Sequence, residues 1–119
     1  MNDPLYRDHL LDHYHFPRNY GLRDNFDIEA RGENPLCGDL LTLRLKLADG
    51  KISATCFESE GCVISRAAAS LFSEYIKGRA VAEVRAVTPE TVLGLLGVAI
   101  MPARLKCALL PLETVQTML

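Results

Sequence analysis

The chain has 119 residues, of which 49% are hydrophobic, with no tryptophan and a formal net charge of -2 at pH 7. A chain of this length buries about two thirds of its unfolded surface and folds without covalent staples, so we predict one domain over residues 1–119. It has no basic run, acidic tail or apolar stretch of membrane-spanning length, which argues against nucleic acid and membrane partners. No signal peptide begins at Met1, so we expect a cytoplasmic protein.

Four cysteines are the chemically notable residues of the chain: Cys37, Cys56, Cys62 and Cys107. In a reducing compartment such residues are better interpreted as metal-binding, reactive or buried thiols than as a disulfide framework. Their spacing contains no CxxC pair of the zinc-finger kind. For Cys56 we favour the role of a small buried residue, because buried cysteines commonly behave as hydrophobes.

A first helix is predicted from Asp3-Pro4, where a cap residue precedes a proline at the first helical position, to about Tyr14. Pro17 and Gly21 end it. His9 and His13 lie four residues apart on one face of this helix, a spacing that can bind metal. Two histidines without a third ligand nearby more often line a polar seam, which is the interpretation we favour.

Three strands are predicted next. Residues 26–31 alternate apolar and charged side chains, residues 41–47 place a leucine at every second position, and residues 51–57 form a return strand. Asp49-Gly50 between the last two is a strong hairpin signal. A two-residue turn there pairs residues whose numbers sum to 99, namely Leu47 with Ile52, Leu45 with Ala54, and Leu43 with Cys56.

If the same register continues toward the other end of the hairpin, Cys37 lies opposite Cys62. Asp39 then lies two residues closer to the turn, on the face that carries the leucines. Residues i and i+2 of a strand share a face, so Cys37 and Asp39 can address one centre. Taken alone, Asn34-Pro35-Leu36-Cys37-Gly38-Asp39 is more typical of an ordinary turn with one buried free cysteine, so the metal interpretation depends on the other cysteines. A bulge in residues 58–61 could shift the register by one residue.

Helical periodicity follows Cys62. Ser65 can cap a helix that Gly78 ends, so Cys62 stands just before a helix N-terminus, where a thiolate is favoured. Shorter helices are predicted over residues 80–84 and 88–96. Pro102 opens a last helix that carries Cys107 in its first turns and docks over the sheet, and Pro111 is expected to kink or interrupt it.

Three separated motifs resemble the IscU/SufU/NifU-N family of iron–sulfur cluster assembly scaffold proteins: Asn34-Pro35-Leu36-Cys37-Gly38-Asp39, Gly61-Cys62-Val63-Ile64-Ser65 and Arg104-Leu105-Lys106-Cys107-Ala108. His13-Tyr14 and Pro17-Arg18-Asn19 also look like the family's amino-terminal segment, so the resemblance runs over nearly the whole chain. It implies an α+β fold, with a three-stranded antiparallel sheet and helices packed on one face, and one iron–sulfur cluster assembly domain over residues 1–119.

By the same resemblance, Cys37, Asp39, Cys62 and Cys107 form the site. Three thiolates and a carboxylate supply the four terminal bonds of a transient [2Fe-2S] cluster, or the four corners of a zinc site when no cluster is present. The oxygen of Asp39 is harder than sulfur, which should make cluster attachment labile.

The implied role is a scaffold that receives persulfide sulfur from a cysteine desulfurase, builds the cluster and transfers it to recipient apoproteins. Such a protein is a transfer scaffold more than an enzyme. The alternative is a SufU-like, zinc-dependent sulfurtransferase that accepts sulfur and activates the desulfurase. A purely structural zinc domain is disfavoured, because the hydrophobic pattern suffices to fold the chain without metal.

Two departures bear on the subfamily. Lys106 stands where IscU-type members usually have histidine, and Ile100-Met101-Pro102-Ala103-Arg104 replaces their Leu-Pro-Pro-Val-Lys chaperone-recognition segment, which argues against dependence on the specialised chaperone. Arg104 and Lys106 look more like SufU, yet the insertion of SufU members between the second and third cysteines is missing. These two cations face a partner or solvent, and their proximity to Cys107 could depress its pKa.

Overall fold

The computed structural model describes residues 4–119. The elements follow in the order α1 (Pro4–His15), β1 (Ile28–Asn34), β2 (Asp39–Ala48), β3 (Lys51–Glu60), α2 (Val63–Ile76), α3 (Val81–Arg85), α4 (Pro89–Leu96), the 3₁₀ turn η1 (Pro102–Arg104) and α5 (Leu105–Met118). The predicted cap Asp3 lies outside the described residues. No helix within them is long and apolar enough to span a lipid bilayer.

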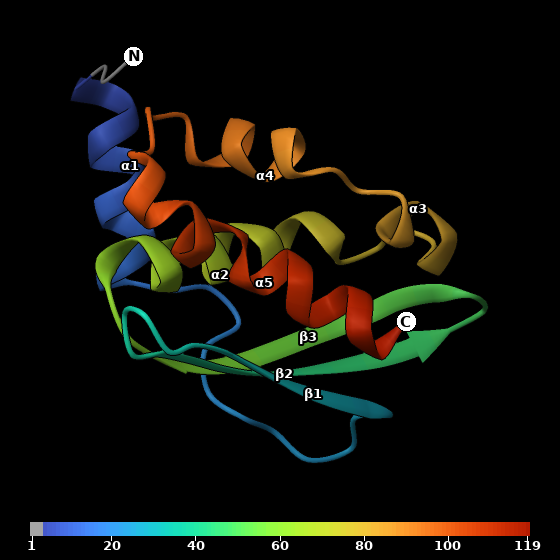
Figure 1. Ribbon diagram of the computed structural model, residues 1–119. Coiled ribbons are helices and arrows are strands. Elements are labelled where there is room, and N and C mark those ends of the chain that lie inside the picture. The colour runs from blue at the N-terminus through green and yellow to red at the C-terminus, as the bar shows by residue number, and fades with distance from the viewer. Residues whose placement is uncertain (1–3) are drawn as a thin grey trace.

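The three strands form one antiparallel sheet in the order β1-β2-β3. The helices lie on one side of this sheet, with α2 and α5 next to it and α4 further out, while the connection from α1 to β1 passes beneath the other side (Figure 1). The predicted fold class is therefore confirmed. The strand predicted over residues 26–31 begins two residues later and continues to Asn34.

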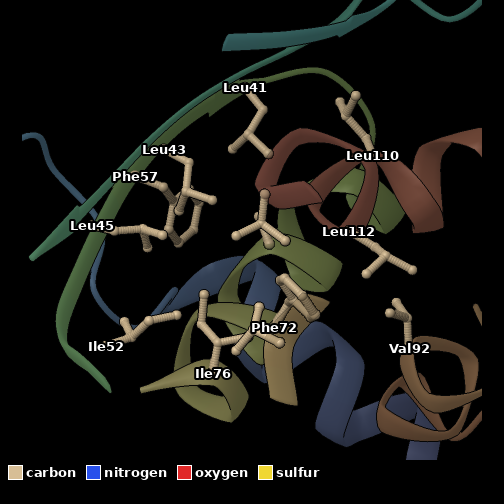
Figure 2. Close-up of a cluster of buried hydrophobic side chains, with 13 residues drawn as sticks. Leu41, Leu43, Leu45, Ile52, Phe57, Phe72, Ile76, Val92, Leu110 and Leu112 are labelled. Carbon is tan, nitrogen blue, oxygen red and sulfur yellow. The ribbon is translucent and has the colours of Figure 1, made fainter. Parts of the chain in front are cut away.

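The core lies between the sheet and the helices. Leu41, Leu43 and Leu45 of β2 point toward α2 and α5, as predicted (Figure 2). Leu47, which the same pattern places on this face, is exposed at the end of the strand. The buried leucines meet Phe72 and Ile76 of α2 and Leu110 and Leu112 of α5. Val92 of α4 closes the far side of the cluster. Burial of these side chains fixes α2 and α5 on the sheet, and so fixes the ends of both helices that carry cysteines.

The hairpin register differs from the prediction beyond its turn. Leu47 pairs with Ile52 as expected, but Lys46 pairs with Ala54, so Ser53 is an extra residue and the register shifts by one. Cys56 is therefore opposite Arg44, not Leu43. Because neighbouring side chains alternate, Cys56 lies on the face away from the helices, and the prediction that it shares the leucine face is wrong.

Cys56 is buried all the same, with 1% of its surface exposed. The chain leading from α1 lies along this part of β3, where the amide of Phe57 donates to the carbonyl of Asn19 at 3.0 Å and the amide of Gly21 donates to the carbonyl of Phe57 at 2.8 Å. Cys56 thus acts as a small buried residue, as favoured, on the opposite side of the sheet from the other cysteines.

His13 joins α1 to α2. The hydroxyl of Ser70 accepts the amide of Arg18 at 2.8 Å and forms a hydrogen bond with Nδ1 of His13 at 2.7 Å. Nε2 of His13 faces the carboxylate of Glu74 at 3.8 Å. Burial, followed by the positive charges of Arg18 and His9, lowers the pKa of His13 below its usual value. His13 thus lies in a polar seam between α1 and α2, as favoured from the sequence, whereas His9 is exposed and lies against its ring.

Candidate metal centre

Cys37 is presented by the loop that joins β1 to β2. Asn34 and Asp39 are the last paired residues of the two strands, and the carbonyl of Asn34 accepts the amide of Cys37 at 3.2 Å. Asn34 and Pro35 are residues that commonly occupy the first two positions of a turn. Gly38 has a φ of 71°, which residues with a Cβ rarely adopt. The loop therefore holds Cys37 exposed at its tip, directly beside Asp39.

The carboxylate of Asp39 is fully buried, yet it is held ionised by donors. Its Oδ1 accepts the backbone amide of Cys62 at 3.0 Å and the hydroxyl of Ser65 at 3.3 Å, and its Oδ2 accepts the side-chain amide of Asn34 at 3.3 Å. Burial alone would raise the pKa of Asp39, but these bonds and the Cys107 thiol outweigh it and keep the pKa below its ordinary value. Asp39 is an anion available to a metal.

Gly61 allows this buried carboxylate to approach β3. It has a φ of 139°, and a Cβ built on it would lie 2.1 Å from Oδ1 of Asp39 and 3.0 Å from its Cα. Both the backbone conformation and the space therefore require glycine. The residue before Cys62 is part of the site, because any side chain there would displace Asp39.

Cys62 is the N-cap of α2. Its Sγ accepts the backbone amide of Ser65 at 3.4 Å, so the prediction that Ser65 caps this helix is wrong, and Ser65 lies inside its first turn. The expected pairing of Cys37 with Cys62 is also wrong. The bulge in β3 makes Leu40 and Glu60 the last paired residues, and Cys62 lies beside Asp39. Its place at a helix N-terminus agrees with the prediction.

Cys107 reaches the site from the first turn of α5 and is fully buried. Close packing of this helix on β1 depends on Gly32, where a Cβ would lie 2.0 Å from Oγ1 of Thr114. The helix continues through Pro111 without the predicted interruption. Pro111 has no amide hydrogen to donate to the carbonyl of Cys107, so the usual helical bond is missing there.

The electrostatics of Cys107 differ from the prediction. Burial, followed by contacts with Asp39, Cys37 and Cys62, raises the pKa of its thiol well above the usual value, so the expected depression by neighbouring cations is wrong for the metal-free site. Arg104 does lie beside the thiols, and Cys107 above all raises the pKa of its guanidinium. The side chain of Lys106 is exposed on the first turn of α5.

Three of the four predicted ligands converge. One ligand atom each from Cys37, Asp39 and Cys107 lies within 4.8 Å of the others, a grouping found once in the part of the chain that the structure describes. Two thiolates at about 2.3 Å from one tetrahedral zinc ion are about 3.8 Å apart, so this donor set suits a single ion once its ligand atoms move together by up to about 1 Å. The sulfur of Cys62 lies at the edge of this group, where it contacts Cys107. It also accepts the amide of Ser65 as the N-cap of α2.

The sequence pattern did not single out Asn34, Gly61 or Ser65 as working parts of the site. Each of them contacts Asp39 or reserves the space for it. Asn34 and Gly61 both belong to the motifs that carry the ligands. A polar residue at the start of the first motif and a glycine directly before Cys62 were the signals that could have indicated their roles. Ser65 was assigned to capping alone.

The chain is similar to known proteins over nearly all of its length. Residues 5–119 match the model of the "NifU-like N terminal domain". The zinc-dependent sulfurtransferase SufU of Bacillus subtilis is 35% identical over 126 residues, covering 91% of this chain and 84% of its own. The iron–sulfur cluster assembly scaffold protein IscU 1 of Archaeoglobus fulgidus is 34% identical over 93 residues, covering 78% of this chain and 61% of its own length.

A solved structure titled as a putative iron–sulfur cluster assembly scaffold protein for the SUF system, from Fervidobacterium islandicum AW-1, superimposes with a TM-score of 0.80. It is 27% identical, and the match covers 93% of each chain. The sequence match over nearly all of the chain, the shared fold and the converging cysteines lead to one conclusion. The chain belongs to the IscU/SufU/NifU-N family of iron–sulfur cluster assembly scaffold proteins.

Proposed function

We propose that this protein receives persulfide sulfur from a cysteine desulfurase, assembles a labile [2Fe-2S] cluster on Cys37, Asp39, Cys62 and Cys107, and passes the cluster to recipient apoproteins. The observation that carries the proposal is the grouping of an exposed thiol, a buried thiol and a buried carboxylate within 4.8 Å. Cys62 lies at the rim of the group, where a small rotation of its side chain can add a fourth donor.

Cys37 is the residue best placed to accept sulfur, because its thiol is exposed and that of Cys107 is buried. In the transfer, the thiolate of Cys37 attacks the outer sulfur of the persulfide on the donor. A new S–S bond forms at Cys37, the S–S bond of the donor breaks, and the donor cysteine leaves as a thiolate. The transfer is an exchange without net oxidation, and a protein partner must bring its persulfide to the loop tip. Conversion of the transferred sulfur to the sulfide of a cluster then consumes two electrons, which an external electron donor must supply.

Asp39 suits a cargo that is built and then released. Three thiolates and one carboxylate give the cluster four terminal bonds, and the oxygen bond is the weakest match to iron bound by sulfide. The hydrogen bonds from α2 hold the carboxylate in place whether or not cargo is bound. The chain therefore keeps the shape of the site after release.

A second candidate is a zinc-dependent sulfurtransferase, in which Cys37, Asp39, Cys62 and Cys107 hold zinc until the desulfurase approaches and one cysteine is freed to accept sulfur. The convergence of the ligand atoms supports it as well, because donors within 4.8 Å of one another can close around a single tetrahedral ion. When bound, zinc would keep the thiols deprotonated at neutral pH.

Two measurements distinguish these functions. Metal-free protein is mixed anaerobically with ferrous iron and sulfide, and visible charge-transfer absorption that is lost on addition of an apo-ferredoxin supports the scaffold. Stimulation of a cysteine desulfurase by the zinc-loaded protein, without bound iron, supports the sulfurtransferase.

Four variants locate the site in both assays. Single substitutions Cys37→Ser, Asp39→Ala, Cys62→Ser and Cys107→Ser are each expected to weaken cluster binding or sulfur acceptance. The site is wrongly assigned if all four leave both properties unchanged. Cys56→Ser is the matched control, because it changes a cysteine on the other face of the sheet and is expected to leave both properties intact.

A further inference from the structure

Asn34 lies inside the candidate metal centre although it is not one of the predicted ligands. Its side-chain nitrogen lies 3.3 Å from Oδ2 of Asp39 and 3.6 Å from Sγ of Cys107, and its backbone carbonyl accepts the amide of Cys37 at 3.2 Å. It is 4% exposed and pairs with Asp39 across the β1–β2 ladder. One residue thus touches three of the four predicted ligands.

The chemistry of the amide explains this arrangement. A side-chain amide group has two hydrogens, which is the number needed to donate once to a carboxylate oxygen and once to a sulfur atom. Both acceptors keep further lone pairs, so a metal can bind them from the opposite side while Asn34 continues to donate. The buried position excludes water, which would otherwise compete for the same two acceptors.

The two oxygens of Asp39 are thereby given different tasks. Oδ1 is used by α2, through the amide of Cys62 and the hydroxyl of Ser65. Oδ2 accepts from Asn34 and has no bond to α2, so it is the oxygen left for a metal. Rotation of the carboxylate would break bonds on both sides, so Asn34 and α2 together fix the direction in which Asp39 offers its lone pairs.

We infer that Asn34 is a positioning residue of the metal centre, which sets Oδ2 of Asp39 and Sγ of Cys107 side by side before any metal arrives. The inference rests on the proposed function, since it requires these residues to be ligands. Partners that orient metal ligands in this way typically contribute about 10-fold to 100-fold to metal affinity. Asn34 acts on the ligands and does not itself bind the metal.

The test measures zinc affinity by competition with a chromophoric chelator, the absorption spectrum with saturating Co²⁺, and urea unfolding without metal. Asn34→Ala removes both donors and is expected to weaken zinc binding by about 10-fold to 100-fold and to alter the Co²⁺ spectrum. Asn34→Ser keeps the residue's suitability for the turn and retains one donor, so its affinity is expected between those of Asn34→Ala and the natural protein.

Cys56→Ala is the control for a loss of packing, and it is expected to unfold more easily while binding zinc with unchanged affinity. The inference is overturned if Asn34→Ala and Asn34→Ser bind zinc as tightly as the natural protein, with the same Co²⁺ spectrum. It is also overturned if a variant of Asn34 and Cys56→Ala lose the same stability and the same zinc affinity, because the loss of affinity would then follow from lost packing. Failure of the natural protein itself to bind any metal would instead refute the proposed function, and this inference with it.

Discussion

Replacing Gly61 by alanine tests the architecture of the site without touching a ligand. The new Cβ would lie 2.1 Å from Oδ1 of Asp39, and the backbone would keep a φ of 139° that alanine rarely adopts. The backbone conformation costs about 1–3 kcal/mol. Forcing an atom into a packed site adds about 1–3 kcal/mol. The sum of about 2–6 kcal/mol is a large part of the roughly 5–15 kcal/mol by which domains are stable.

Gly78→Ala is the matched control, because Gly78 has a φ of 88° but open space around the position of a Cβ. Urea unfolding of the metal-free proteins gives both losses of stability, and their difference isolates the contact with Asp39. We expect Gly61→Ala to lose about 1–3 kcal/mol more than the control and to bind zinc more weakly. Equal losses, with unchanged zinc affinity, would refute the packing of Asp39 against Gly61.

The remaining predictions concern stability away from the ligands. Cys56→Ala is expected to cost roughly 0.5–3 kcal/mol in urea unfolding, without loss of zinc binding, and a change in zinc affinity would contradict its place on the far face. The pKa of His13 is lower in the folded protein, so the unfolded chain binds a proton at this residue more readily. The free energy of unfolding is therefore highest above about pH 6.5 and declines as the pH falls below that value. Thermal unfolding between pH 7.5 and 5.5 should show this decline, and His13→Gln should flatten it. Gly32→Ala should cost about 1–3 kcal/mol, because its Cβ would overlap Thr114. Gly94→Ala meets nothing within 4 Å inside α4 and should instead stabilise the protein by roughly 0.5–1 kcal/mol.

The strands and helices were accessible from the sequence because their signals are local. Alternating leucines, the Asp49-Gly50 turn and proline at the start of α4 each specify structure within a few residues. The register of the hairpin could be predicted from the turn only as far as the bulge at Ser53. Ser53 has no feature that marks it as an extra residue, and one inserted residue moves every later side chain of β3 to the other face.

The sequence named three residues that the structure brings together, but it did not predict the geometry of their contacts. Cys37, Asp39 and Cys107 converge even though the pairing of Cys37 with Cys62 was wrong, because the loop and the two helix ends meet independently of the strand register. The pKa of Cys107 could not be inferred from Arg104 and Lys106 in the sequence, since burial has the larger effect and depends on how α5 packs. Long-range packing of this kind leaves no local pattern.

The origin of the site's side chains in three separate segments links metal binding to folding. The β1–β2 loop, the start of α2 and the start of α5 come together only in the native chain, so a bound ion stabilises the folded state alone. A metal at about 100 times its dissociation constant would add about 2.7 kcal/mol to the stability of the folded state, and its release would remove this gain. The bonds between Asp39 and α2 do not require metal. In the metal-free protein they hold the start of α2 against β2, beside the hydrophobic core that keeps the chain folded.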